Sequence, residues 1–167
     1  MSWLIFLPNL GMGASTGVGV TQTFRQALYA KLASISEVSA IVGSAIYPGW
    51  LPQTHDLARD GPALTYEIPT DPHGQVLGGS DGTSSAHVKL RGWSYDLSET
   101  DPLMLALFNA LNGAPGEWGN GTCAIMSVTH QDSSDEDVPP RAGTDLWQPT
   151  IVDEYLIRYR IPLPTLS

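Results

Sequence analysis

Two segments of the chain alternate between apolar and polar side chains, and this alternation limits the possible folds more than any other feature of the sequence. They cover residues 85–96 and 154–163. Successive side chains of a strand point to opposite faces, so both segments are predicted to be long strands with two different faces. In the first, Val88 and Leu90 share one face, and the other face carries Lys89, Arg91, Trp93 and Tyr95. In the second, one face carries Tyr155, Ile157, Tyr159 and Ile161, and the other Leu156, Arg158 and Arg160.

Helical periodicity predicts three helices. Apolar residues three or four positions apart line one face of the segment 21–35, which is the pattern of an amphipathic helix. A short second helix follows, with Ser36 as its N-cap and Gly43 at its end. A stripe of leucines over residues 98–111 predicts a further helix, capped by its first residue and ended by Asn112-Gly113.

The fold class follows from the order of these segments. Shorter apolar segments at 45–47, 63–68 and 122–129 predict additional strands. Strands joined by short or loop-only links pair antiparallel, and the helices must cover a sheet face to bury their apolar stripes. We therefore expect an α+β fold: an antiparallel-dominated sheet of about four to five strands with two main helices packed on one face. Because 167 residues are too few for two ordinary domains, we expect residues 21–167 to form a single domain.

Glycine and proline occur 17 and 13 times, and they predict many turns. Residues 1–20 are expected to form a Gly-rich N-terminal arm that opens with an apolar cluster, Trp3 to Leu7. Pro8 interrupts this cluster and no basic residue precedes it, so a signal peptide is not expected. Long loops are expected at 69–85 and 131–149.

The chain is acidic: 17 Asp and Glu residues oppose 8 Lys and Arg residues, for a net charge of -9. So few cations argue against tight general binding to nucleic acid or to an anionic membrane surface. No apolar stretch is long enough to span a bilayer, so we expect a soluble protein with no membrane partner. Four acidic residues gather in the second expected loop and should project into solvent: Asp132, Asp135, Glu136 and Asp137.

The sequence contains no convincing catalytic motif. The single cysteine, Cys123, lies in an apolar run and is expected to be a buried, inert thiol. The four histidines are scattered and form no metal-binding pair. A small metal-dependent hydrolase that uses His130 with Asp132 and Asp135 is a less favoured alternative. We expect no enzyme activity, no catalytic residues, no metal and no cofactor.

Several stretches in a fixed order resemble the tail-completion or tail-terminator proteins of long-tailed bacteriophages, whose relatives occur in gene-transfer particles. The resemblance runs from Phe24 to about Leu163, through FRQALYAKLAS, EVSAIVG, SAIYPGWLPQ, GPALTYEI, VKLRGWSYD and EYLIRYRIPL. Its most specific part is the set Ile46-Tyr47-Pro48, Pro62 and Trp93. The arm and the two long loops depart from the family pattern.

The resemblance implies a structural virion protein, assembled in the host cytoplasm. Such a protein forms a homo-oligomeric ring that caps the head-proximal end of a tail tube, stops tube polymerisation and joins the tail to the head connector. The implied partners are the tail tube protein and a connector or portal-side protein, and DNA passes through without specific binding. The alternative is a head-side connector, adaptor or neck protein of the same particle.

Aromatic and arginine side chains on a sheet either cover its second face or build a protein interface. The candidate interface residues are Arg91, Trp93, Tyr95, Arg158, Arg160 and, in the arm, Trp3 and Phe6. The four clustered acidic residues are expected at the channel or its rim, with a solvated outer loop as the alternative.

Overall fold

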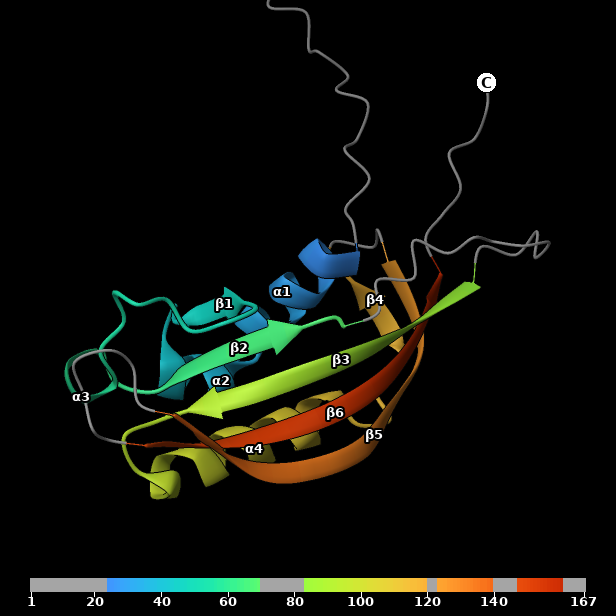
Figure 1. Cartoon of the computed structure of the whole chain (residues 1–167). Coiled ribbons are helices and arrows are strands. Elements are labelled where there is room, and N and C mark those ends of the chain that lie inside the picture. Colours follow the sequence, from blue (N-terminus) through green and yellow to red (C-terminus); the bar gives the residue numbers. More distant parts are fainter. Residues whose placement is uncertain (1–23, 70–82, 120–122, 140–146, 161–167) are drawn as a thin grey trace, which may run out of the picture.

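The described residues form a six-stranded mixed sheet, with the main helices packed on one face (Figure 1). The computed structural model describes residues 24–69, 83–119, 123–139 and 147–160. The strands are β1 (Ile46–Pro48), β2 (Ala63–Glu67), β3 (Thr83–Trp93), β4 (Gly116–Trp118), β5 (Cys123–Val138) and β6 (Gln148–Arg160). Their order across the sheet is β1-β2-β3-β6-β5-β4. The pair β1–β2 is parallel, and the other four pairs are antiparallel.

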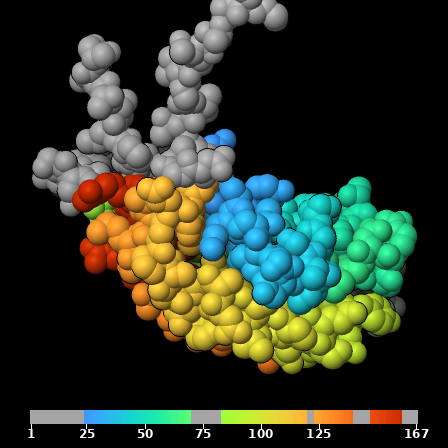
Figure 2. Space-filling view, turned by 180° about the vertical axis from the view of Figure 1, so that it is seen from behind, coloured from blue at the N-terminus to red at the C-terminus, as the bar shows by residue number. Residues whose placement is uncertain are grey.

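The helices are α1 (Phe24–Ser34), α2 (Ser36–Val42), α3 (Leu57–Asp60) and α4 (Leu97–Leu111). Seen from behind the sheet, α1, α2 and α4 lie together over it (Figure 2). The short α3 lies apart from them, at the far end of β2 (Figure 1). The expectation that the opening helices and α4 share one sheet face is confirmed.

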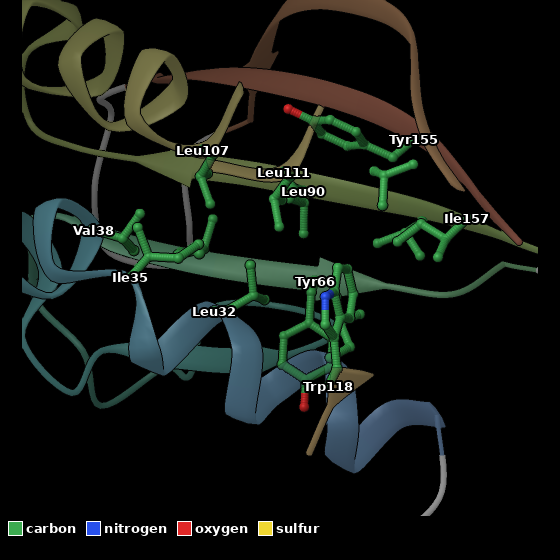
Figure 3. Close-up of a cluster of buried hydrophobic side chains, with 14 of the residues drawn as sticks. Leu32, Ile35, Val38, Tyr66, Leu90, Leu107, Leu111, Trp118, Tyr155 and Ile157 are labelled. Carbon is green, nitrogen blue, oxygen red and sulfur yellow. The ribbon is translucent and has the colours of Figure 1, made fainter. Parts of the chain in front are cut away.

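The main core lies between these three helices and the sheet (Figure 3). Leu28 and Leu32 of α1 are fully buried there, as are Leu103 and Leu107 of α4. The sheet contributes alternate residues of its strands to the same cluster: Leu64, Tyr66, Ala86, Val88, Leu90, Tyr155, Ile157 and Tyr159. The predicted faces of the first helix and of the last strand are therefore the buried ones.

The sheet is larger than expected, because the sequence pattern missed one strand, β4, and it is mixed because β1 and β2 are parallel. β4 has three residues, too few for an alternation to be recognised. β1 and β2 were expected to pair antiparallel but are parallel, because the chain crosses between them through a segment that contains α3. The Pro-rich stretch between β1 and β2 is thus a crossover connection with a helix of its own.

The second predicted loop, 131–149, is wrong over most of its length. β5 continues to Val138 and β6 begins at Gln148, so residues 131–138 belong to a strand paired with β6. Backbone pairing does not require apolar side chains, and polar residues are tolerated because residues 131–137 are exposed. In the first predicted loop, residues 83–85 are strand, and residues 70–82 lie outside the described part of the chain. The N-terminal arm, 1–20, also lies outside it.

Helix caps differ from the expected residues by one or two positions. The N-cap of α4 is Asp96, whose carboxylate accepts a hydrogen bond from the backbone N–H of Ser98. Ser98 was expected to be the cap, but it lies inside the helix. In the same way, the N-cap of α2 is Ile35 and not Ser36. Ser36 is the first residue of the helix, and its hydroxyl donates a hydrogen bond to the carboxylate of Glu37. The predicted ends of these helices at Gly43 and Asn112 agree with the structure within one residue.

Gly92 lets α4 approach β3 closely. A Cβ atom at this position would lie 2.7 Å from the Thr100 Cγ2 and 3.0 Å from the Met104 Sδ, both side-chain atoms of α4. The first distance is shorter than any ordinary contact between carbon atoms. The absence of a side chain at Gly92 is therefore required by the packing of the helix on the sheet.

We predict that Gly92→Ala destabilises the fold by about 1–3 kcal/mol, because the added methyl group overpacks this contact. Thr100→Ser removes the methyl group that the new Cβ would meet and keeps a hydroxyl beside Ser94. The double variant Gly92→Ala/Thr100→Ser should therefore be more stable than Gly92→Ala alone. Urea unfolding measures both differences. Equal stability of Gly92→Ala and the natural chain would show that α4 does not pack this closely.

Candidate assembly surface

The sheet face opposite α1, α2 and α4 is the candidate assembly surface. Residues directly paired across β3, β6 and β5 share a face, so this surface can be read from the strand register. Glu154 of β6 pairs with Lys89 on one side and Asp132 on the other, and Val152 pairs with Arg91 and Ser134 in the same way. The surface is mainly polar and charged, unlike the helix-covered face.

Arg91 is the centre of the most connected group on this surface. Its Nη1 lies 2.7 Å from the Glu136 Oε2 and donates a hydrogen bond of 3.0 Å to the Thr150 Oγ1. The Thr150 hydroxyl in turn donates to the backbone carbonyl of Glu136 at 2.8 Å. The guanidinium also lies 5.2 Å from the ring centroid of Trp50 and 5.6 Å from that of Trp93. These contacts tie three strands together, and they leave the Arg91 side chain only 13% exposed.

Trp93 was expected to be an exposed contact residue, and the structure corrects this. It lies on the expected sheet face but is 1% exposed. It packs in a second, smaller core with Ala45, Leu51, Leu57 and Ala63, under the β1–β2 connection. Its indole Nε1 donates to the Thr65 Oγ1 at 2.9 Å, so its polar atom is also satisfied inside the chain.

Arg158 and Arg160 are both exposed near the end of β6. Within the described residues, neither forms an ion pair. Lys89 differs from them, because its Nζ lies 2.5 Å from the Glu154 Oε1 and this carboxylate raises the pKa of the lysine. In the described part of the chain, both arginines are therefore available to a partner.

The four clustered acidic residues do not form one patch. They lie on β5, where alternation divides them between the two sheet faces. Glu136 pairs with Thr150 and Asp132 with Glu154, which places both on the open face. Asp135 pairs with Ile151, a core residue, and Asp137 pairs with Pro149, so they lie on the opposite face. All four are exposed at this end of β5.

Tyr95 follows the end of β3 and is 64% exposed. It lines a cavity of about 350 Å³ together with Trp147, which immediately precedes β6 and is also exposed. Sequence reasoning pointed to Tyr95 but missed Trp147, which lay inside a predicted loop. The other two predicted interface residues, Trp3 and Phe6, lie outside the described part of the chain.

The hydrolase alternative requires His130 to act with Asp132 and Asp135, but the carboxylate that His130 contacts in the described structure is that of Asp153. The His130 Nε2 lies 3.6 Å from the Oδ1 of the buried Asp153, whose Oδ2 accepts a hydrogen bond of 3.3 Å from the Tyr155 hydroxyl. Burial, with the Asp153 charge, raises the pKa of Tyr155, so this hydroxyl stays protonated as a donor. In the described ranges, no three His, Cys, Asp or Glu side chains come together as a metal site.

Two further observations concern the described residues. Cys123 is fully buried, and burial raises the pKa of its thiol to about 11, as expected for an inert residue.

None of the helices seen in the structure is long and apolar enough to cross a membrane.

We predict that Arg91→Lys destabilises the chain by about 1–3 kcal/mol, because an ammonium cannot contact both tryptophan rings and bridge Glu136 to Thr150. Lys89→Gln removes the more exposed ion pair of the same sheet face and should cost only about 0–1 kcal/mol. Urea unfolding followed by tryptophan fluorescence measures both. A loss for Arg91→Lys no larger than that for Lys89→Gln would contradict a structural role of the Arg91 group.

A scan against protein-family models gave no match, and a search of curated proteins gave none. The search of solved structures did find matches. One is a chain of a structure described as "Virion of native gene transfer agent (GTA) particle", with a TM-score of 0.53 and 15% sequence identity. The match covers 86% of this chain and 98% of that one. The two chains therefore share a fold over nearly the whole of the matched protein.

Proposed function

We propose that this chain is a structural component of a phage-like particle, and that its specific role is to form a ring at the head-proximal end of a tail tube. In this role it stops tube polymerisation and provides the surface on which the head connector docks. It acts through protein contacts and not through catalysis. The observation that carries the proposal is the fold shared with a chain of a gene transfer agent virion over 98% of that chain's length.

The division of the sheet into two faces supports an assembly role. One face is sealed by α1, α2 and α4, whereas the other carries charged side chains and a hydrogen-bonded group around Arg91. In a ring closed by rotation, one surface of each subunit contacts a different surface of the next subunit. Arg158 and Arg160 lie at one end of β6, and the exposed acidic residues of β5 lie beside its other end. Surfaces of opposite charge at opposite ends suit such a head-to-tail contact.

The net charge supports passage of DNA without retention. A subunit of charge -9, repeated around a ring, surrounds the channel with negative charge. Phosphates are then repelled over a Debye length of about 8 Å at physiological salt. Asp132 and Glu136 would face the channel if the open sheet face lines it, whereas Asp135 and Asp137 would not.

The proposal is tested by adding the purified chain to tail tube protein of the same particle during polymerisation. We expect shorter tubes, each ending in a ring that negative-stain electron microscopy resolves, and a mass of several subunits by light scattering. Binding to portal or connector protein without any effect on tube length would replace this role with that of a head-side adaptor. A chain that binds neither component would refute the assembly role altogether.

We predict that the double variant Arg158→Glu/Arg160→Glu keeps its fold but loses ring formation and tube capping. Both side chains are exposed and unpaired in the described structure, so their reversal removes a contact between subunits and little stability. Arg158→Lys/Arg160→Lys should assemble nearly as the natural chain does. Lys31→Glu/Ala33→Glu/Ala40→Glu changes the net charge equally at α1 and α2 and is the matched control. Assembly lost equally in the control would mean that net charge, and not this surface, decides the outcome.

A further inference from the structure

The cavity next to Tyr95 lies at the end of the sheet where β3 ends and β6 begins. It has a volume of about 350 Å³, and Tyr95 and Trp147 on its walls are 64% and 61% exposed. The remaining lining residues are Asp56, Leu57, Ala58, Ser94, Gln148 and Pro149. Two large aromatic side chains exposed beside one concave site are typical of a surface that a protein partner covers.

A polar group in the lining also lacks a partner. The Gln148 Oε1 is buried, and it accepts no hydrogen bond in the described structure. Buried side-chain oxygens in native proteins are nearly always hydrogen-bonded. An occupant that carries an N–H donor, such as a peptide or an indole, would supply what this amide lacks after a small rotation of the side chain.

The N-terminal arm has the composition of such an occupant. The first 23 residues contain no Asp, Glu, Lys or Arg, and Trp3 to Leu7 are consecutive apolar residues. A short apolar segment of this kind cannot form a core of its own and gains free energy by burial on another surface. Trp3 also supplies an indole N–H.

The arm joins the domain at the opposite end from the cavity. The ring of Phe24 stacks on that of Tyr159, with centroids 4.3 Å apart, near the end of β6. Gln148 stands at the start of β6, eleven residues away, which is roughly 35 Å along a strand. Up to about 60 Å of chain separates Phe6 from Phe24 when fully extended, so the arm can reach beyond its own subunit.

We propose that the apolar segment Trp3–Leu7 of one subunit docks in the Tyr95–Trp147 cavity of a neighbouring copy of the same chain. This inference rests on the proposed ring, and it names the contact that links successive subunits of that ring. Docking on a second copy buries the exposed aromatic side chains of the cavity and the apolar cluster of the arm together.

The distribution of charge favours a neighbouring copy over docking within one chain. Arg158 and Arg160 lie at the end where the arm joins the domain, with Glu117 of β4 partly offsetting their charge. Asp137 pairs with Pro149 beside the cavity, and Asp135 lies two residues before it on β5. The arm-bearing end of one subunit is therefore attracted to the cavity-bearing end of the next, which leaves the arm a short distance to cross.

Cross-linking between two single-cysteine variants tests this contact. Ser2→Cys places a thiol beside Trp3, and Ala58→Cys places one at the exposed side of the cavity without removing an aromatic residue. The natural Cys123 is fully buried, and burial raises the pKa of its thiol, so we expect it not to compete for the cross-linker. A mixture of the two full-length variants, treated with a short thiol-specific cross-linker under conditions of ring assembly, should give covalent dimers. Asn109→Cys, at an exposed position on α4, replaces Ala58→Cys as the control and should give few.

Removing the aromatic walls checks that the cavity itself is responsible. Tyr95→Ala/Trp147→Ala in the Ala58→Cys chain should lower the yield of dimers several-fold, whereas Leu105→Ala, at an equally exposed apolar residue, should leave it unchanged. A ring of normal mass by light scattering that gives no Ser2–Ala58 cross-link overturns this inference and leaves the proposed ring intact. A chain that carries both Ser2→Cys and Ala58→Cys tests docking within one subunit. If this chain cross-links internally while the mixture of single variants gives no dimers, the arm docks on its own subunit and the exchange between copies is overturned. A monomer in every mixture, including those with tube ends, overturns the ring itself.

Discussion

The rest of the structure depends on the position of β6 between β3 and β5. Both neighbours pair with it over nearly its full length, so alternation along one strand decides what lies on either side of the sheet. Tyr155, Ile157 and Tyr159 face the helices and are buried, which fixes the side on which α1, α2 and α4 must pack. The residues between them are left on the other face, away from α1, α2 and α4. A structural core and an available surface thus arise from the same thirteen residues.

The parts of the fold that could be predicted are those whose side chains make the pattern. The stripe of α1 and the alternation of β6 were read correctly because burial selects apolar residues at those positions. The second half of β5 could not be read in this way, because its residues are polar and its strand conformation is held by backbone pairing with β6. The parallel pairing of β1 and β2 was equally hidden, since it depends on the path of the connection and not on either strand's sequence.

The candidate surface was predictable in its residue types but not in its geometry. Alternation placed Arg91 and Trp93 on the correct face, yet the sequence gives no sign that the β1–β2 connection covers Trp93 or that Arg91 reaches Glu136 on β5. The acidic run looked like one patch because its members are close in sequence, and pairing with β6 divides them between two faces. Tyr95 and Trp147 are more than fifty positions apart in sequence, and the cavity that they share exists because β3 ends where β6 begins.

Ring assembly by this chain would depend on the difference between the two ends of its long strands. Close to the C-terminal end of β6 lie Phe24, the first described residue after the arm, and Arg158 and Arg160, which form no ion pair within the described residues. Close to its N-terminal end lie the aromatic cavity and the acidic part of β5. In a two-fold dimer, each arm-bearing end would have to meet the cavity-bearing end of the other subunit at the same time, which requires the long strands of the two subunits to lie side by side in opposite directions. Head-to-tail contacts leave such surfaces exposed only at the ends of an open row, and closing the row into a ring removes those ends. The opposite ends of the long strands are therefore compatible with the proposed ring, and the mass of the assembly separates a ring from a reciprocal two-fold dimer.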